Sequence, residues 1–407
     1  MNILLLTPQP PYPPIQGAAI RNYQVLRHLA ERHRVWLATF VPSGSSPDLG
    51  DLPALCASVT TVPAPVRTKS ERLRAMLASS LPDMALRLHS TEFCRQVSHL
   101  MVSQRFDVVH VEGIEMAHYG LALSAADGQK PRTIFEDHNA EYVLQRRAFE
   151  TDVRVPRRWV QAGYSLVQWR RLRRYERGVI SSYDRVIAVS DADRRALQVL
   201  VPGLDVAVIP NCVDTESFAA GASSEELPDL IFVGTMDYRP NVDAVLWFVR
   251  AVMPLLWSRK PDLRFWIVGL RPTAAVRRLG TDRRIVVTGG VPDVRPLLAA
   301  HGVCVVPMRV GGGTRIKVLE AMAMAKGIVS TTFGCEGLGV EDGRHVLLAD
   351  GPTQFAAKCL RLLEDPQERL RLGFEARRFV RERFDWRVVT PLLSRVYESL
   401  ALESRVQ

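Results

Sequence analysis

One stretch of the sequence has residue types that suit the binding of an anion. It begins with three consecutive glycines, Gly311–Gly313, which would let backbone N–H groups approach a phosphate closely. A helix is predicted from Thr314, and its positive end would point at the same place. Arg315 and Lys317 add full positive charges, and an arginine can bind two phosphate oxygens at once. The stretch therefore predicts a phosphate site.

A carboxylate accompanies these cations. Glu320 follows Lys317 by three residues and would share its helix face. A carboxylate beside an anion site suits a nucleoside diphosphate, whose ribose offers hydroxyl groups. For any one of these residues an ordinary loop and helix start with an exposed Lys–Glu pair explains the sequence better. Their combination after the apolar run Val303–Pro307 favours the phosphate site.

A second group of polar residues, Asp137–Glu141, follows the apolar segment Arg132–Glu136. Ligands of open α/β sheets bind beyond the carboxyl ends of the strands, so His138 is a candidate proton carrier or hydrogen-bond donor. The alternative is a helix cap by Asp137 or Asn139, with His138 at the surface. His110 is a weaker candidate of the same kind.

Three further residues could approach a ligand. Gly17 opens a predicted helix after a long proline-rich turn, which is unlike the G-x-G-x-x-G turn of dinucleotide sites, so a nicotinamide-dependent dehydrogenase is disfavoured. Gly234 ends the apolar run Phe232–Gly234, and Arg239 follows it and could reach a phosphate. Taken alone, Gly17 is equally well explained as a helix-start glycine, and Arg239 as a surface turn residue.

We expect no metal ion. Asp191 and Asp193 form an Asp-x-Asp pair, but Ser190 precedes them and a helical pattern follows. Ser-x-x-Asp at this place is a helix cap. The six cysteines are scattered without a Cys-x-x-Cys pair, which favours reduced thiols in a cytosolic enzyme over disulfides or structural zinc.

The elements that would position these residues alternate between apolar runs and helical patterns. A chain of 407 residues exceeds one hydrophobic core, and the alternation predicts two doubly wound α/β domains. We place the first at residues 1–203 together with a C-terminal helix at 387–407, and the second at 204–386. The predicted strands are Asn2–Thr7, Val35–Val41, Val59–Val62, Val108–Val111, Arg132–Glu136 and Arg185–Ser190, then Leu230–Gly234, Arg264–Val268, Arg284–Thr288, Val303–Pro307, Ile328–Ser330 and His345–Leu348.

The formal charge of +10 leans towards anionic partners. Residues 145–177 hold ten arginines and three acidic residues, with aromatics among them, and basic helices with Trp and Leu can lie on anionic membranes. A helix predicted from Arg158 to Ile180 places Trp159 and Leu172 on one side, so a packed helix with a solvated basic face is the favoured alternative. No nucleic-acid-binding module accompanies the charge. With no apolar run of ~18 residues, we expect a cytoplasmic protein, peripheral at the inner face of the membrane if the basic segment binds lipid.

The sequence resembles the GT-B glycosyltransferases of the GT4 (group 1) type, in particular the bacterial branch that builds exopolysaccharides. The main match is Gly312-Gly313-Thr314-Arg315-Ile316-Lys317-Val318-Leu319-Glu320-Ala321-Met322-Ala323. Shorter matches are Phe232–Gly234, Ile209–Asp214, Asp137–Glu141 and Phe384–Trp386. Together they extend over nearly the whole chain.

The resemblance implies two Rossmann-like domains facing across a cleft, with the last helix crossing back to the first domain. It implies retaining transfer from a nucleotide-sugar donor to a glycan or polyprenyl-linked acceptor, without a metal ion. Arg315 and Lys317 would hold the diphosphate, supported by the backbone of Gly234 and of Gly312, Gly313 and Thr314, and Glu320 would bind the ribose. His138 would contact the transferred sugar, and the loop at Gly17 would close near the donor.

Two positions depart from the family pattern. The family usually has two glutamates flanking seven residues, and Gly312 stands at the first of these positions, so Glu336 is a candidate substitute. Thr235 stands where a basic residue is usual, which would shift phosphate binding to Arg315, Lys317 and Arg239. Two other functions stay open: a sugar-nucleotide epimerase with the same fold, and a non-catalytic subunit that binds a glycan or nucleotide-sugar.

Overall fold

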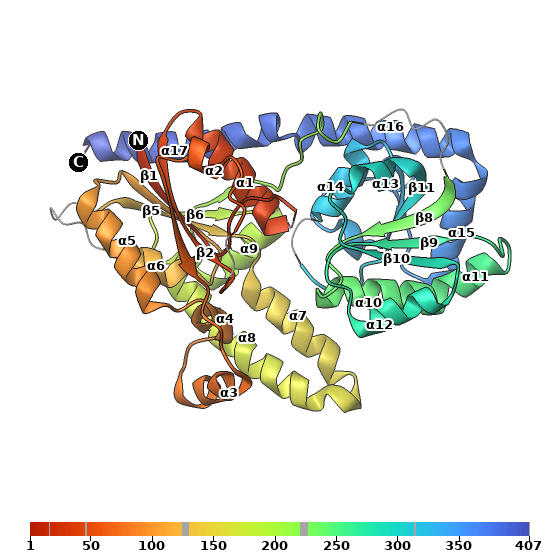
Figure 1. Cartoon of the computed structure of the whole chain (residues 1–407), viewed down its shortest axis with the longest axis horizontal. Helices are drawn as coiled ribbons and strands as arrows, with labels where there is room; N and C mark the ends of the chain where they lie inside the picture. Colours follow the sequence, from red (N-terminus) through yellow and green to blue (C-terminus); the bar gives the residue numbers. More distant parts are fainter. Residues whose placement is uncertain (16, 45–46, 124–129, 220–226, 313–314, 407) are drawn as a thin grey trace. The chain divides into compact units, whose positions relative to one another are not determined.

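Each half of the chain forms a parallel β-sheet with helices packed around it (Figure 1). The computed structural model describes residues 1–15, 17–44, 47–123, 130–219, 227–312 and 315–406. Unit 1 comprises Met1–Pro210 with Thr390–Gln407, and unit 2 comprises Asn211–Val389. The sequence placed these boundaries after residues 203 and 386.

Unit 1 has a seven-stranded sheet in the order β3-β2-β1-β4-β5-β6-β7. Its strands are β1 (Asn2–Thr7), β2 (Arg34–Val41), β3 (Ser58–Pro63), β4 (Val108–Glu112), β5 (Arg132–Asp137), β6 (Arg185–Ala188) and β7 (Val206–Val208). Its helices are α1 (Gly17–Ala30), α2 (Leu52–Leu55), α3 (Lys69–Ala78), α4 (Asp83–Arg87), α5 (Thr91–Ser103), α6 (Ala117–Leu121), α7 (Glu141–Val153), α8 (Trp159–Ile180) and α9 (Asp191–Leu200). The inner strands are buried along nearly their whole length, as both faces of a parallel sheet are covered by helices.

Unit 2 has a six-stranded sheet in the order β10-β9-β8-β11-β12-β13. Its strands are β8 (Leu227–Val233), β9 (Phe265–Val268), β10 (Ile285–Gly289), β11 (His301–Val306), β12 (Gly327–Ser330) and β13 (Leu347–Leu348). Its helices are α10 (Arg239–Trp247), α11 (Met253–Trp257), α12 (Ala274–Arg277), α13 (Arg295–Ala300), α14 (Ile316–Ala323), α15 (Pro352–Glu364) and α16 (Pro366–Arg383), with short 3-10 turns at Arg278–Thr281 and Phe333–Cys335. One hydrophobic core joins the sheet to these helices.

The last helix, α17 (Trp386–Val406), leaves unit 2 and joins unit 1 from Thr390 onward. Its Ser394 Oγ lies 2.8 Å from His28 Nε2 of α1. The predicted return of the C-terminal helix to the first domain is confirmed. None of the helices in the described part of the chain is long and apolar enough to cross a bilayer.

Two elements depart from the expected pattern. Val206–Val208, just after the domain boundary predicted at residue 203, forms β7 beside β6. The helix that begins as α10 is interrupted by a π-helical turn at Phe248–Val252 before it continues as α11. Pro254 follows this turn and lacks the N–H that a regular α-helix would use there, which accounts for the interruption.

Candidate active site

In unit 2 the candidate site lies where β11 leads into α14. The helix begins at Ile316, not at Thr314 as predicted, and Arg315 is its N-cap residue. Gly313 and Thr314 lie outside the described residues. The Arg315 side chain is almost completely buried, donates to the Gly312 carbonyl oxygen and stacks 5.1 Å from the centroid of Phe333. Arg315 therefore fixes the shape of the glycine loop as well as adding charge.

Lys317 lies in the first turn of α14 and points towards the end of β8. Its Nζ donates to Asn241 Oδ1 over 2.6 Å and lies 4.3 Å from the ring centroid of Phe232. A Cβ on Gly234 would come within 2.7 Å of this Nζ and 2.8 Å of Asn241 Nδ2. Gly234 therefore makes room for the lysine and its partner, which explains why a glycine ends the strand.

Asn241 is a site residue that the sequence reasoning missed. It is buried, and its Nδ2 donates to the Thr235 carbonyl oxygen over 2.8 Å while its Oδ1 accepts from Lys317. It thus aims Lys317 from the start of α10. The available signal was its place three residues into the helix that follows the glycine turn at Gly234.

Burial shapes the charge of this site. Desolvation lowers the pKa of Lys317 to about 7, and the nearby Arg315 cation acts in the same direction. Desolvation also raises the pKa of the buried Glu320 to about 7, against the opposing effect of Lys317. Both groups would gain their charged forms if a ligand supplied the missing counter-charge or hydrogen bonds. The site is therefore arranged for an anionic, hydroxyl-bearing ligand.

The other predicted residues of unit 2 lie around this core. Gly311 has a φ of +116°, and a Cβ there would approach Pro240 to 3.1 Å, so the glycine loop rests against the first turn of α10. Arg239 is the exposed first residue of that helix. Glu336 is exposed and directly follows the 3-10 turn whose Phe333 faces Arg315. The structure thus brings Gly311 against α10 and leaves Arg239 and Glu336 at the surface.

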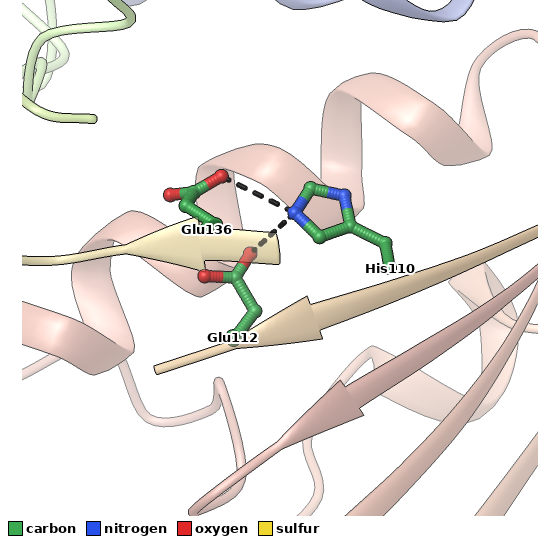
Figure 2. Close-up of side chains that lie close together, drawn as sticks. All are labelled: His110, Glu112 and Glu136. Atoms are coloured by element: carbon green, nitrogen blue, oxygen red, sulfur yellow. Dashed lines mark ion pairs between the residues drawn. The ribbon is translucent and has the colours of Figure 1, made fainter. Parts of the chain in front are cut away.

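In unit 1 a second cluster lies at the carboxyl ends of β4 and β5 (Figure 2). His138 Nε2 is 2.7 Å from Glu112 Oε2. His110 Nε2 lies 3.5 Å from Glu112 Oε1 and 3.3 Å from Glu136 Oε2. Both glutamates and His110 are fully buried. The predicted candidate His138 is therefore held by carboxylates that the sequence reasoning did not single out.

Two helices close this cluster. Arg21 of α1 forms an ion pair with Glu136 and donates to the Ile209 carbonyl oxygen over 2.9 Å. Tyr397 Oη of α17 lies 2.7 Å from His110 Nδ1. The predicted residue Gly17 is the exposed first residue of α1, one turn before Arg21. The C-terminal helix is thus hydrogen-bonded into the cluster that holds His138.

The charges of the cluster compensate one another. Burial opposes ionisation of Glu136, but Arg21 and His110 outweigh it and keep the pKa of its carboxyl low. Burial also disfavours the His138 cation, but the Glu112 carboxylate raises the pKa of the imidazole above its usual value. Among the described residues, His110, Glu112 and Glu136 form the one group whose ligand atoms approach closely enough to hold a metal ion, within 4.8 Å of one another. Arg21 and His138 face the two carboxylates, while His110 Nε2, Glu112 Oε1 and Glu136 Oε2 make no hydrogen bond within the described part of the chain.

The alternative role for the residues before α7 is wrong. Neither Asp137 nor Asn139 caps this helix; its N-cap residue is Ala140, without a side-chain cap. Glu176 of α8 instead accepts from the N–H groups of Glu141 and Tyr142, each over 2.9 Å.

The predicted cap at Ser190 is confirmed. Ser190 Oγ accepts from the Asp193 N–H over 3.1 Å, and Asp193 Oδ1 accepts from the Ala140 N–H over 3.1 Å. Asp193, the second acid of the Asp-x-Asp pair, is therefore hydrogen-bonded at the starts of both α9 and α7. The expected absence of a metal ion stays a prediction.

Two family models match adjoining parts of the chain. One, described as Glycosyltransferase Family 4, matches residues 15–217, and the other, described as Glycosyl transferases group 1, matches residues 227–365. Sucrose-phosphate synthase from Thermosynechococcus elongatus has a similar structure, with a TM-score of 0.74, 18% identity and coverage of 99% of this chain and 100% of that chain. HepE of Anabaena in complex with UDP has a TM-score of 0.66 at 15% identity, covering 98% of this chain and 100% of that one.

Among curated proteins, the phosphatidyl-myo-inositol mannosyltransferase of Mycolicibacterium smegmatis is 32% identical over 226 residues. The match covers 53% of this chain and 57% of the mannosyltransferase, so it spans little more than half of that relative.

The two parallel-sheet units and the similar structures define a GT-B fold, and the two family models define the class of enzyme as a glycosyltransferase. More specifically, the chain belongs to the group 1, or GT4-type, glycosyltransferases. The predicted fold and enzyme class are confirmed.

Proposed function

We propose that this glycosyltransferase moves a sugar from a nucleotide-sugar to a glycan or lipid-linked acceptor in the synthesis of a polysaccharide or cell-surface glycan, with retention of the anomeric configuration. The proposal rests mainly on the position of Lys317 and on the lowered pKa of its amino group. Lys317 is directed at the end of β8 by Asn241, and its pKa is depressed in the absence of an anion. A diphosphate beside Gly234 would supply the charge that this lysine lacks.

The residues divide the work as follows. Lys317 and Arg315 bind the diphosphate, with Arg239 available at the surface, and Glu320 accepts hydrogen bonds from the ribose hydroxyls. His138, whose protonated form Glu112 favours, donates a hydrogen bond to the transferred sugar. Negative charge grows on the diphosphate as the sugar–phosphate bond breaks, and fixed cations at a helix start stabilise it. These groups make a metal ion on the diphosphate unnecessary in this proposal.

The donor and acceptor classes draw support from the relatives. The HepE structure holds UDP, and the mycobacterial relative is named for the transfer of mannose to phosphatidyl-myo-inositol. A nucleotide-sugar donor and a lipid-linked acceptor fit both. Glu336, beside the Arg315–Phe333 contact, is our candidate for the sugar contacts that a glutamate at position 312 makes in the usual family pattern.

The test is a thermal-shift screen with UDP-, GDP- and ADP-sugars, followed by transfer assays with the nucleotide-sugar that binds. A bound donor raises the unfolding temperature with the logarithm of its concentration over its dissociation constant. Transfer to an acceptor glycan or lipid supports the proposal. A donor converted to its epimer without any acceptor, seen by NMR, would identify an epimerase, and binding without any turnover would identify a non-catalytic subunit.

A further inference from the structure

Helices α7 and α8 of unit 1 form a hairpin that projects away from the β-sheet (Figure 1). They are joined by Val153–Val160, which we call the tip; it includes a 3-10 turn at Pro156–Arg158. The C-terminal half of α8 packs in the core of unit 1 through Leu172, Val179 and Ile180. The buried residues of this 22-residue helix begin at Ala162, so its first turn lies outside the core.

The tip exposes large apolar side chains. Val160 is 86% exposed and Trp159 is 64% exposed, and Val153 and Val155 are exposed to 45% and 38%. The sequence placed Trp159 on the packed side of the helix with Leu172; the structure buries Leu172 and leaves Trp159 in solvent. The favoured alternative, a core-packed helix with a solvated basic face, therefore describes α8 from Ala162 onward but not its first turn. Clustered exposed apolar residues mark an interaction surface.

Positive charge surrounds these apolar residues. Arg154, Arg157 and Arg158 are all exposed, and the tip itself has no acidic residue. The nearest acid in the chain, Asp152, is buried and pairs with Arg158 at 3.4 Å. The tip thus presents a net positive charge together with an aromatic and three valines. This combination complements a surface that has anionic headgroups above an apolar layer.

The polar N–H group of the Trp159 indole already has a hydrogen-bond partner within the tip. Trp159 Nε1 donates to the Val153 carbonyl oxygen over 3.2 Å, so two polar groups are satisfied within the tip itself. A hydrogen-bonded N–H costs far less to remove from water than an open one. Trp159 could therefore enter the headgroup–acyl boundary without leaving an unsatisfied donor.

We propose that the tip Val153–Val160 docks on a membrane that contains anionic lipids, with Trp159 and Val160 inserted and the arginines on the headgroups. The proposal goes beyond the transfer reaction: it places unit 1 on the lipid surface where a lipid-linked acceptor would be found. Each arginine near an anionic surface strengthens binding about fivefold. High salt should release the protein, because the attraction is screened within a Debye length.

The test is co-sedimentation of the full chain with vesicles of phosphatidylcholine alone and with added phosphatidylglycerol. We expect binding to the anionic vesicles at about 0.02 M salt and release at about 0.5 M. Trp159→Ala combined with Val160→Ser should weaken binding about tenfold or more, and Arg154→Gln with Arg157→Gln about 25-fold. Phe374→Ala is the matched control, since Phe374 is 66% exposed on α16, and it should bind like the wild type.

A spectroscopic readout locates the contact. Vesicles should shift the tryptophan emission of the wild type to the blue, and Trp159→Phe should lose most of this shift while it still sediments. The proposal is overturned if anionic vesicles do not bind the wild type at low salt, or if the tip variants bind as well as the control. A concentration-dependent dimer that the tip variants abolish would also overturn it, by assigning the tip to a second copy. Thermal shifts by nucleotide-sugars should be the same in all these variants, so failure of docking is distinguishable from failure of the proposed function.

Discussion

The two polar clusters of this glycosyltransferase differ in whether their surroundings favour the charged forms of their side chains. In unit 1 the carboxylates of Glu112 and Glu136 face His138 and Arg21 at ion-pair distance, and the pKa values move in the directions that favour the ionised forms. In unit 2 the hydrogen-bond partner of Lys317 is the neutral amide of Asn241, and burial lowers the pKa of Lys317 to about 7. The charged groups of unit 1 pair with one another in the free protein, whereas in unit 2 desolvation outweighs the attraction between Lys317 and Glu320.

The difference indicates two roles: the unit 1 cluster holds a side chain in place, and the unit 2 cluster binds a ligand. The unit 1 network fixes His138 through groups on β4, β5, α1 and α17, so its orientation does not depend on substrate. Lys317 is aimed by Asn241, and the attraction of Glu320 does not offset its desolvation, so we expect a diphosphate to restore its charge. Electrostatic catalysis usually comes from groups that are already positioned where charge develops in the transition state.

The largest effect should follow from opening the unit 1 cluster. Arg21→Met leaves Glu136 buried without its cation and should lower the free energy of unfolding of unit 1 by about 3–5 kcal/mol. The deficit should narrow as the pH falls, because the low pKa of Glu136 contributes stability only while the carboxylate is ionised. Denaturant unfolding followed by circular dichroism at two pH values measures both effects.

The double variant Arg21→Met with Glu136→Gln is the control. It removes both charges and should recover most of the lost stability. If the single variant is as stable as the wild type, the unit 1 cluster is not held by charge compensation.

The next effect concerns the unit 2 cluster. Lys317→Ala should reduce transfer about 10²- to 10³-fold without lowering the unfolding temperature, because burial penalises the lysine charge in the free protein. Lys326→Met is the matched control: Lys326 is a buried lysine in the same unit whose Nζ donates to the Ala299 carbonyl oxygen. Steady-state transfer rates and thermal unfolding give the answer. Undiminished transfer by Lys317→Ala would remove the lysine from the mechanism.

A third substitution converts one kind of cluster into the other. Asn241→Asp gives Lys317 a carboxylate partner, as Glu112 gives His138, and should weaken nucleoside diphosphate binding at least about tenfold through compensation and repulsion. Asn241→Leu removes the hydrogen bond without adding charge and should weaken binding less. Calorimetric titration of both variants measures the two losses; equal losses would mean that the added negative charge does not affect diphosphate binding.

The smallest predicted change lies in unit 1. Glu112→Gln keeps a hydrogen-bond acceptor beside His138 but removes the negative charge, so the pKa of His138 should fall. A pH titration by NMR with labelled histidine measures it directly, and the low-pH limb of transfer should move with it. A pKa that does not change would show that Glu112 acts only as a hydrogen-bond acceptor.

The sequence predicts much of this molecule where a local signal is strong. Buried parallel strands are continuous apolar runs, and β1 (Asn2–Thr7) has the predicted bounds. The three-residue strand Val206–Val208 has too few residues to show a pattern, and its neighbours Pro202 and Gly203 resemble a linker. The tip is a similar case. The spacing of Trp159 and Leu172 predicts that they lie on the same side of the helix, but it does not predict at which residue the helix leaves the core.

The site follows the same rule. Glycines, Arg315, Lys317 and Glu320 are adjacent in the chain and were predicted together. Asn241 reaches Lys317 from 76 residues away, and Tyr397 reaches His110 across 287. Such partners depend on how strands and helices are stacked, which the order of residues along the chain does not reveal.

The measurement that tests the central claim most directly is proton uptake when the nucleoside diphosphate of the preferred donor binds. Calorimetry in two buffers with different ionisation enthalpies, at about pH 8 where the phosphate is fully ionised, gives the number of protons. Because the pKa of Lys317 in the free protein is about 7, binding should take up protons from solution, and affinity should fall as the pH rises above that value. We expect no uptake in Lys317→Met. Binding by the wild type without proton uptake, or equal uptake in the variant, would contradict the claim that Lys317 becomes protonated when the diphosphate binds.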